Sequence, residues 1–303
     1  MKRFWKSFGW FWMSMVPMAA CMAMQLLISG IAMGIYALFQ IFTQYSGTEI
    51  WEDQARLTEL LLEKMYEGVS LGIFVFHIFN VGVFALWYYL AVHRKKRALW
   101  RVSNEINGNP AIRPRTSVNV QSVGLVTLIG VGLCVFTNAF VLIWQYIAPE
   151  FINDYIETME ASGFGVSILA ILAAVVLAPI GEELLCRGVI QYYAGKVSRR
   201  FWVVNIIQAF AFGIMHGNWV QGVYAFLLGL VMGWVRHRFD SLILAMIIHF
   251  VVNFSSSFWI DRVLMPLPDT LLVKGVLLVV SMGVITGGLL LLEKGRPHRS
   301  TVN

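Results

Sequence analysis

The sequence predicts an all-α, polytopic membrane protein with about eight transmembrane helices around an intramembrane polar site. Of its 303 residues, 58% are hydrophobic and only 13% are charged, and the mean hydropathy is +0.70. Soluble domains contain about 25% charged residues and roughly 45–50% apolar residues. This composition excludes a soluble globular domain and a disordered chain. The three cysteines lie in apolar stretches, which argues against a disulfide-stapled secreted fold.

Long apolar runs give the positions of the expected helices. A transmembrane helix needs about 20 apolar residues, and short polar connections separate the runs. The runs predict two units: an N-terminal membrane region of two spans over residues 1–118 and a six-span core over residues 119–303. The expected spans are residues 10–42, 69–92, 119–147, 164–186, 201–217, 219–235, 241–259 and 270–292.

The charges predict how these spans are oriented. Eighteen of the 23 Lys and Arg residues fall in the N-terminus, the C-terminal tail and three connections, residues 93–118, 196–200 and 236–240. Cytoplasmic segments carry such an excess of basic residues, so both termini are expected in the cytoplasm. Topology and attraction to anionic membrane lipids account for the net charge of +6 without a nucleic-acid partner. Short connections fit a multi-pass protein of a bacterial inner (plasma) membrane, and the membrane of the eukaryotic endoplasmic reticulum is the alternative location.

Residues 48–67 differ from the apolar runs around them. Leu57, Leu60, Leu61 and Met65 recur at helical spacing, with acidic residues between them. This pattern is typical of an amphipathic helix. We expect it to lie on the outer face of the membrane.

The fourth span carries three ionisable residues, Glu182, Glu183 and Arg187. Charges inside a bilayer are costly and point to function by default, although a lone ion pair is often only structural. Glu183 and Arg187 are four residues apart and share a helix face, whereas Glu182 is rotated from Glu183 by about 100°. One carboxylate can therefore pair with Arg187 while the other remains available as a base. Pro179 is expected to loosen the hydrogen bonding of this helix.

Two further spans carry His216, and His249 with Asn253. A glutamate can take a proton from water, and imidazoles can orient that water, bind a metal or stabilise an oxyanion. A single His in a span is often only an interhelical hydrogen-bonding group. An acid pair, two His and an Asn within residues 182–253 favour a water-activating site. His77, which lies among phenylalanines, is expected to be a packed polar residue.

Three short motifs carry a family resemblance. EELLCR (Glu182 to Arg187), FGIMH (ending at His216) and HFVVN (His249 to Asn253) occur in this order on separate apolar segments. The combination resembles the CPBP family of intramembrane proteases, which includes CAAX prenyl endopeptidases and bacteriocin-processing, Abi-like proteins. The resemblance covers about residues 164–260. It implies eight helices, a site inside the bilayer and hydrolysis of a peptide bond.

The resemblance also implies roles for the motif residues. Glu182 would be the general base, Glu183 and Arg187 would support it, and Asn253 would help to form an oxyanion hole. His216 and His249 would bind the water or a metal. A zinc ion held by Glu182 and the two imidazoles is left open, although the short-range HExxH arrangement is absent. The expected partners are membrane lipids and a peptide or protein at the membrane, either prenylated or carrying a leader.

Two other functions compete with the protease. A proton- or ion-coupled transporter could use the same polar residues as a relay, but it would predict paired repeats, which we do not find in the sequence. A non-catalytic membrane scaffold or immunity protein would be favoured by a missing motif residue. All the motif residues are present.

Overall fold

The computed structural model describes residues 2–46, 49–94, 118–164 and 166–294, and within these ranges it contains helices and turns but no strand. Six helices are long and apolar enough to cross a membrane, and two further apolar helices are shorter. The prediction of an all-α, multi-pass membrane protein is confirmed. The long helices are Trp5–Tyr45, Val69–His93, Val120–Ile147, Ile168–Val197, Trp219–Phe239 and Leu271–Lys294, and the short ones are Phe201–Ile214 and Leu242–Phe258.

Each of the eight expected spans is therefore a helix, but two of them are too short to span a bilayer unaided. The short helices have 14 and 17 residues, which correspond to about 21 Å and about 26 Å. The hydrocarbon core of a bilayer is about 30 Å thick. Both short helices pack against longer neighbours; α10 ends two residues before His216, and α12 contains His249 and Asn253.

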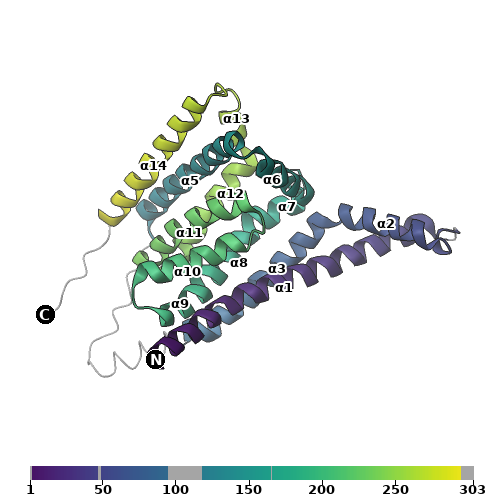
Figure 1. Ribbon diagram of the computed structural model, residues 1–303, viewed down its shortest axis with the longest axis horizontal. Coiled ribbons are helices and arrows are strands. Elements are labelled where there is room, and N and C mark those ends of the chain that lie inside the picture. Colours follow the sequence, from purple (N-terminus) through teal and green to yellow (C-terminus); the bar gives the residue numbers. More distant parts are fainter. Residues whose placement is uncertain (1, 47–48, 95–117, 165, 295–303) are drawn as a thin grey trace.

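The N-terminal region is a long helical pair with a polar helix at one end. Helix α1 (Lys2–Tyr45) has 44 residues, or about 66 Å, and runs beside α3 (Val69–Tyr88). Between them lies α2 (Gln54–Glu67), preceded by the short 3-10 turn η1 (Glu49–Trp51). In Figure 1 the far end of α1 projects with α2 beyond the other helices.

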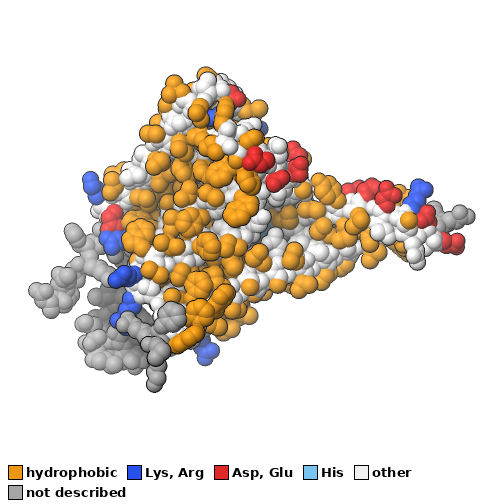
Figure 2. Space-filling view, in the orientation of Figure 1, with side chains coloured by type: hydrophobic (Ala, Val, Ile, Leu, Met, Phe, Trp, Pro, Cys, Tyr) orange, Lys and Arg blue, Asp and Glu red, His pale blue; other side chains and the backbone are white. Residues whose placement is uncertain are grey.

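Helix α2 lies within the segment of residues 48–67 that we expect to be amphipathic. Its start is fixed by Asp53, whose carboxylate accepts a hydrogen bond from the backbone N–H of Arg56. None of its residues is buried, and Figure 2 shows a row of acidic side chains along it. Residues 95–117 of the expected basic loop fall outside the described residues.

The core consists of tightly packed helices joined by short connections. Helix α5 (Val120–Ile147) packs against α12 (Leu242–Phe258) and α14 (Leu271–Lys294), and α10 (Phe201–Ile214) packs against α11 (Trp219–Phe239). Glycines permit these approaches. A Cβ atom on Gly213 of α10 would lie 2.6 Å from the carbonyl oxygen of Gly222 in α11. Helices α6 (Pro149–Ser162) and α13 (Ile260–Leu264) cover one end of the core (Figure 1).

The fourth membrane helix is continuous, but two of its segments are π-helical and not α-helical. Two π-helical turns flank its middle segment, the one that carries Glu182 and Glu183. Pro179 stands just after the first of them and cannot donate a backbone hydrogen bond, so the predicted loosening is confirmed. Such π-turns occur frequently at functional sites. The pieces are α7 (Ile168–Leu172), η3 (Ala173–Leu177), α8 (Ala178–Glu183), η4 (Leu184–Ile190) and α9 (Gln191–Val197).

The N-terminal region packs against this segmented helix, with α1 touching α9 and α3 touching α8. Figure 1 shows the start of α1, the end of α9 and the end of α14 toward the same side. Figure 2 shows Lys and Arg mainly on that side and Asp and Glu mainly over α2 and α6. This separation of charge fits the expected orientation, which stays a prediction.

Candidate active site

A polar cavity of about 790 Å³ lies between the helices, where the three sequence motifs meet. Glu182, His216, His249 and Asn253 all line it. Apolar side chains from α10, α11 and α12 complete much of its wall, among them Phe212, Ala225, Leu228 and Val252. The structure therefore brings predicted residues from three separate segments, α8, the end of α10 and α12, to one site.

The two adjacent glutamates have different surroundings. The Glu182 side chain borders the cavity and is 15% exposed, whereas the Glu183 side chain is fully buried behind it. Glu183 Oε1 accepts a hydrogen bond from Arg187 Nη1 at 2.7 Å, which confirms the predicted pair four residues apart. A buried charge of this kind is tolerated only when it is paired. Glu182 is left as the carboxylate that faces the cavity.

Glu183 also holds His249. Its Oε1 lies 3.0 Å from His249 Nδ1. A carboxylate that is paired with a guanidinium accepts hydrogen bonds only, so we assign the hydrogen to Nδ1 and the lone pair to Nε2. His249 Nε2 lies 3.9 Å from Glu182 Oε2, which is too long for a direct hydrogen bond. A water molecule can bridge groups at such a distance.

His216 is oriented by the residue four positions before it. Its Nδ1 lies 2.8 Å from the carbonyl oxygen of Phe212, which can only accept, so Nδ1 donates and Nε2 carries the lone pair. The Phe212 ring meets the imidazoles of His216 and His249 edge-on, with centroids 5.0 Å and 5.6 Å away. The guanidinium of Arg187 lies 4.3 Å from the centre of the same ring. Phe212 thus packs against three site residues at once.

Asn253 connects α12 to the first π-helical turn. Its Nδ2 donates a hydrogen bond to the carbonyl oxygen of Ala174 at 2.8 Å. One of its two amide hydrogens is used in this bond. The second can serve a substrate oxygen, as the expected oxyanion role requires.

The arrangement does not form the three-ligand zinc site that the sequence left open. Among the described residues, no group of three or more His, Cys, Asp and Glu side chains could hold a metal ion. Glu182, His216 and His249 line one cavity without converging on one point as ligands.

The end of the cavity near α6 carries further polar groups. Tyr155, Glu160 and Asp261 line it there, and burial raises the pKa of the Tyr155 phenol, which keeps it uncharged. Among the described lining residues, three are carboxylates and none is Lys or Arg. The cavity is therefore negatively charged within a chain of net positive charge.

Helix α3 contributes two lining residues that the sequence analysis did not assign to the site. His77 packs beside Phe76 as expected, with ring centroids 4.9 Å apart, but it also borders the cavity, as does Asn80. The two residues are three positions apart in an otherwise apolar span. Their shared helix face was a signal that the sequence contained.

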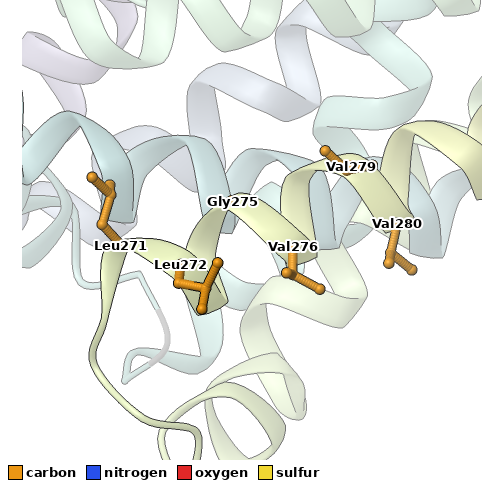
Figure 3. A pocket seen from close by; sticks show the side chains of 6 residues that line it. All are labelled: Leu271, Leu272, Gly275, Val276, Val279 and Val280. Atoms are coloured by element: carbon orange, nitrogen blue, oxygen red, sulfur yellow. The ribbon is translucent and has the colours of Figure 1, made fainter.

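A second hollow, of about 530 Å³, has a different character. Figure 3 shows it along one face of α14, lined by Leu271, Leu272, Gly275, Val276, Val279 and Val280. All of these residues come from one helix, and none has a polar side chain. The hollow suits lipid chains and offers no group for chemistry.

Comparison with known proteins identifies the segment that carries the site. Residues 164–255 match the family model described as type II CAAX prenyl endopeptidase Rce1-like. The matched segment, just under a third of the chain, contains all six motif residues from Glu182 to Asn253 and confirms the resemblance to the CPBP proteases there. No curated protein and no solved structure matches the chain.

Proposed function

Because its motif segment is Rce1-like, we propose that this membrane protein is an intramembrane endopeptidase that hydrolyses a peptide bond with glutamate-activated water. One observation carries the proposal. Glu182 faces the Nε2 lone pair of His249 across 3.9 Å in a polar cavity, and Glu183 fixes the orientation of that imidazole. A water molecule between these two groups would have a proton acceptor on one side and an orienting group on the other, which supports the proposal.

In the first step, the water between Glu182 and His249 attacks the carbonyl carbon of the substrate. Glu182 takes one proton from the water, and His249 Nε2 accepts a hydrogen bond from the other hydrogen. The new C–O bond forms as the electron pair of the C=O bond moves to its oxygen. The free amide hydrogen of Asn253 donates to this oxyanion.

In the second step, the oxyanion collapses and the C–N bond breaks. Glu182 returns its proton to the departing nitrogen, so the products are an amine and a carboxylic acid. His216 Nε2 carries a lone pair, and it therefore holds a water or an N–H group of the substrate rather than the oxyanion.

The cavity favours a peptide with uncharged or basic residues near the cleaved bond. Glu160, Glu182 and Asp261 contribute negative charge, and no described lining residue is Lys or Arg. Both prenylated termini and leader peptides of membrane-bound precursors fit this description. The proposed location is a bacterial inner membrane, with lipids and the substrate as partners.

The test compares membrane peptides from cells that express the wild-type protein or Glu182→Gln. The substitution keeps the shape of the side chain and removes its ability to take a proton. Peptides ending at one type of bond should be present with the wild type and absent with Glu182→Gln, as measured by mass spectrometry at matched protein levels. Glu157→Gln, the same change at an exposed position of α6 outside the cavity, is the control. Identical peptide profiles for wild type and Glu182→Gln would remove the proposal.

A further inference from the structure

The wall of the cavity formed by α3 carries two polar residues, His77 and Asn80. They stand three positions apart on one helix face, while Ile78 and Phe79 between them are about half exposed on the outer surface. Helix α3 belongs to the N-terminal region, outside the Rce1-like segment of residues 164–255. It packs on α8, which also contacts α12. His77 and Asn80 thus line the site from a helix outside the matched segment.

Both residues have a buried nitrogen without a hydrogen-bond partner. His77 is 9% exposed and Asn80 is fully buried, and neither His77 Nδ1 nor Asn80 Nδ2 makes a hydrogen bond. The great majority of buried polar groups in proteins are hydrogen-bonded, because an unpaired one destabilises the fold. Because His77 and Asn80 both border the cavity, a molecule that occupies it can supply the missing partners.

The Asn80 amide lies between α1 and the segment that carries Glu182. Its Oδ1 accepts a hydrogen bond from Cys21 Sγ at 3.5 Å, which leaves Nδ2 as the unpaired group. The Nδ2 atom packs against Gly181, the residue before Glu182, where a Cβ atom would lie within 2.6 Å. A side chain at position 181 would displace the amide. The Asn80 amide therefore packs against the residue that precedes the proposed base.

His77 lies about 4.5 Å farther along the helix axis, toward the end of α3 that meets α6. There Ser70 Oγ donates a hydrogen bond to the carbonyl oxygen of Ser162 at 3.2 Å. Ser162 and Glu160 border the same cavity. His77 and Asn80 thus follow the cavity from its α6 end toward Glu182.

We propose that His77 and Asn80 bind the backbone of the peptide substrate. The Asn80 amide donates to a substrate carbonyl oxygen beside the cleaved bond, and His77 Nδ1 pairs with a backbone group nearer the α6 end. This inference rests on the proposed protease function and assigns part of substrate recognition to the N-terminal region. Backbone contacts of this kind align the peptide without selecting its side chains.

The test uses His77→Phe and Asn80→Leu, which keep the approximate shape and remove the hydrogen-bonding groups. His77→Asn restores an amide near the position of Nδ1, and Ile78→Phe is the control on the outward face of the same helix. With the substrate found by the Glu182 comparison, we expect His77→Phe and Asn80→Leu to raise KM about three- to tenfold each while kcat stays within about twofold. His77→Asn should recover most of the loss, and Ile78→Phe should match the wild type.

Thermal unfolding provides a readout that needs no substrate. A structural role would lower Tm in His77→Phe and Asn80→Leu, whereas removal of the unpaired nitrogens should leave Tm unchanged or raise it; in Asn80→Leu the weak bond from Cys21 Sγ is also lost, so His77→Phe is the cleaner readout. Unchanged KM in both variants, or a lowered Tm that accounts for lost activity, would overturn the inference. Either of these outcomes would overturn only the role of His77 and Asn80, because the wild-type protein would still cleave its substrate. Failure of the protease function itself would instead appear as identical wild-type and Glu182→Gln profiles.

Discussion

Glu182 and Glu183 are neighbours in sequence with opposite surroundings, and the site is built on this difference. Helical spacing predicts which of them pairs with Arg187, because residues four apart share a face. Spacing cannot predict that Glu183 also holds His249, since that contact joins residues 66 positions apart. It depends on how α8 and α12 pack. The pairing of Glu183 with Arg187 could therefore be predicted from the sequence, whereas the tautomers of His216 and His249 could not.

The buried pair gives a stability prediction. Glu183→Gln leaves the Arg187 guanidinium buried without its countercharge, so we expect a loss of about 3–5 kcal/mol in the free energy of unfolding. The double variant Glu183→Gln/Arg187→Met removes both charges and should be less destabilised than the sum of the two single variants. Denaturant unfolding in detergent measures both. Single and double effects that simply add would show that the two charges are not coupled.

At the scale of elements, the sequence predicted where helices occur but not how they are wound or how far they extend. Apolar runs mark all eight, yet the two shortest fall below the thickness of a bilayer, and α1 exceeds it about twofold. The π-helical turns around α8 arise from backbone hydrogen bonding, which the pattern of apolar residues does not encode. Ala174 lies in the π-helical turn η3, and its carbonyl oxygen accepts a hydrogen bond from the side-chain amide of Asn253.

This link predicts the effect of changing Asn253. Asn253→Leu removes the bond to Ala174 and the second amide hydrogen, so kcat should fall about 10²- to 10³-fold, as for the loss of one oxyanion donor. Stability should fall by only about 1–3 kcal/mol. Separate measurement of kcat and KM on the identified substrate checks this. A rise in KM with unchanged kcat would assign Asn253 to substrate binding alone.

Close packing of α10 against α11 gives a second prediction at this scale. A Cβ atom at Gly213 would meet the backbone of Gly222, which cannot yield as a flexible side chain can. Gly213→Ala should therefore destabilise the protein by about 1–3 kcal/mol and shift His216. Gly124→Ala in α5, where a Cβ atom would have nothing within 4 Å, is the matched control and should unfold like the wild type. Equal melting temperatures for both variants would contradict this packing.

For the whole molecule, charge and motif patterns carried most of what the sequence could predict. Basic and acidic residues separate toward different ends, and three motifs marked the Rce1-like segment. The N-terminal region carries no motif. Its share of the site, His77 and Asn80, depends on the long-range contact between α3 and α8, which apolar periodicity does not specify.

The orientation can be tested by labelling single cysteines in intact cells. The native cysteines Cys21, Cys134 and Cys186 are all buried and should react little. Glu59→Cys on α2 should react with a membrane-impermeant maleimide in intact cells, whereas Arg199→Cys should react only after the membrane is permeabilised. The reverse pattern would invert the proposed topology and place the α6 end of the cavity in the cytoplasm.

The central claim is that Glu182 activates the water that cleaves the peptide bond. The most direct measurement is the single-turnover cleavage rate of the identified substrate by purified protein in ¹⁸O-labelled water. The wild type should release a fragment whose new carboxylate carries one ¹⁸O atom, and Glu182→Gln should lower the rate by about 10²- to 10⁴-fold. Cleavage by Glu182→Gln at the wild-type rate would contradict the account.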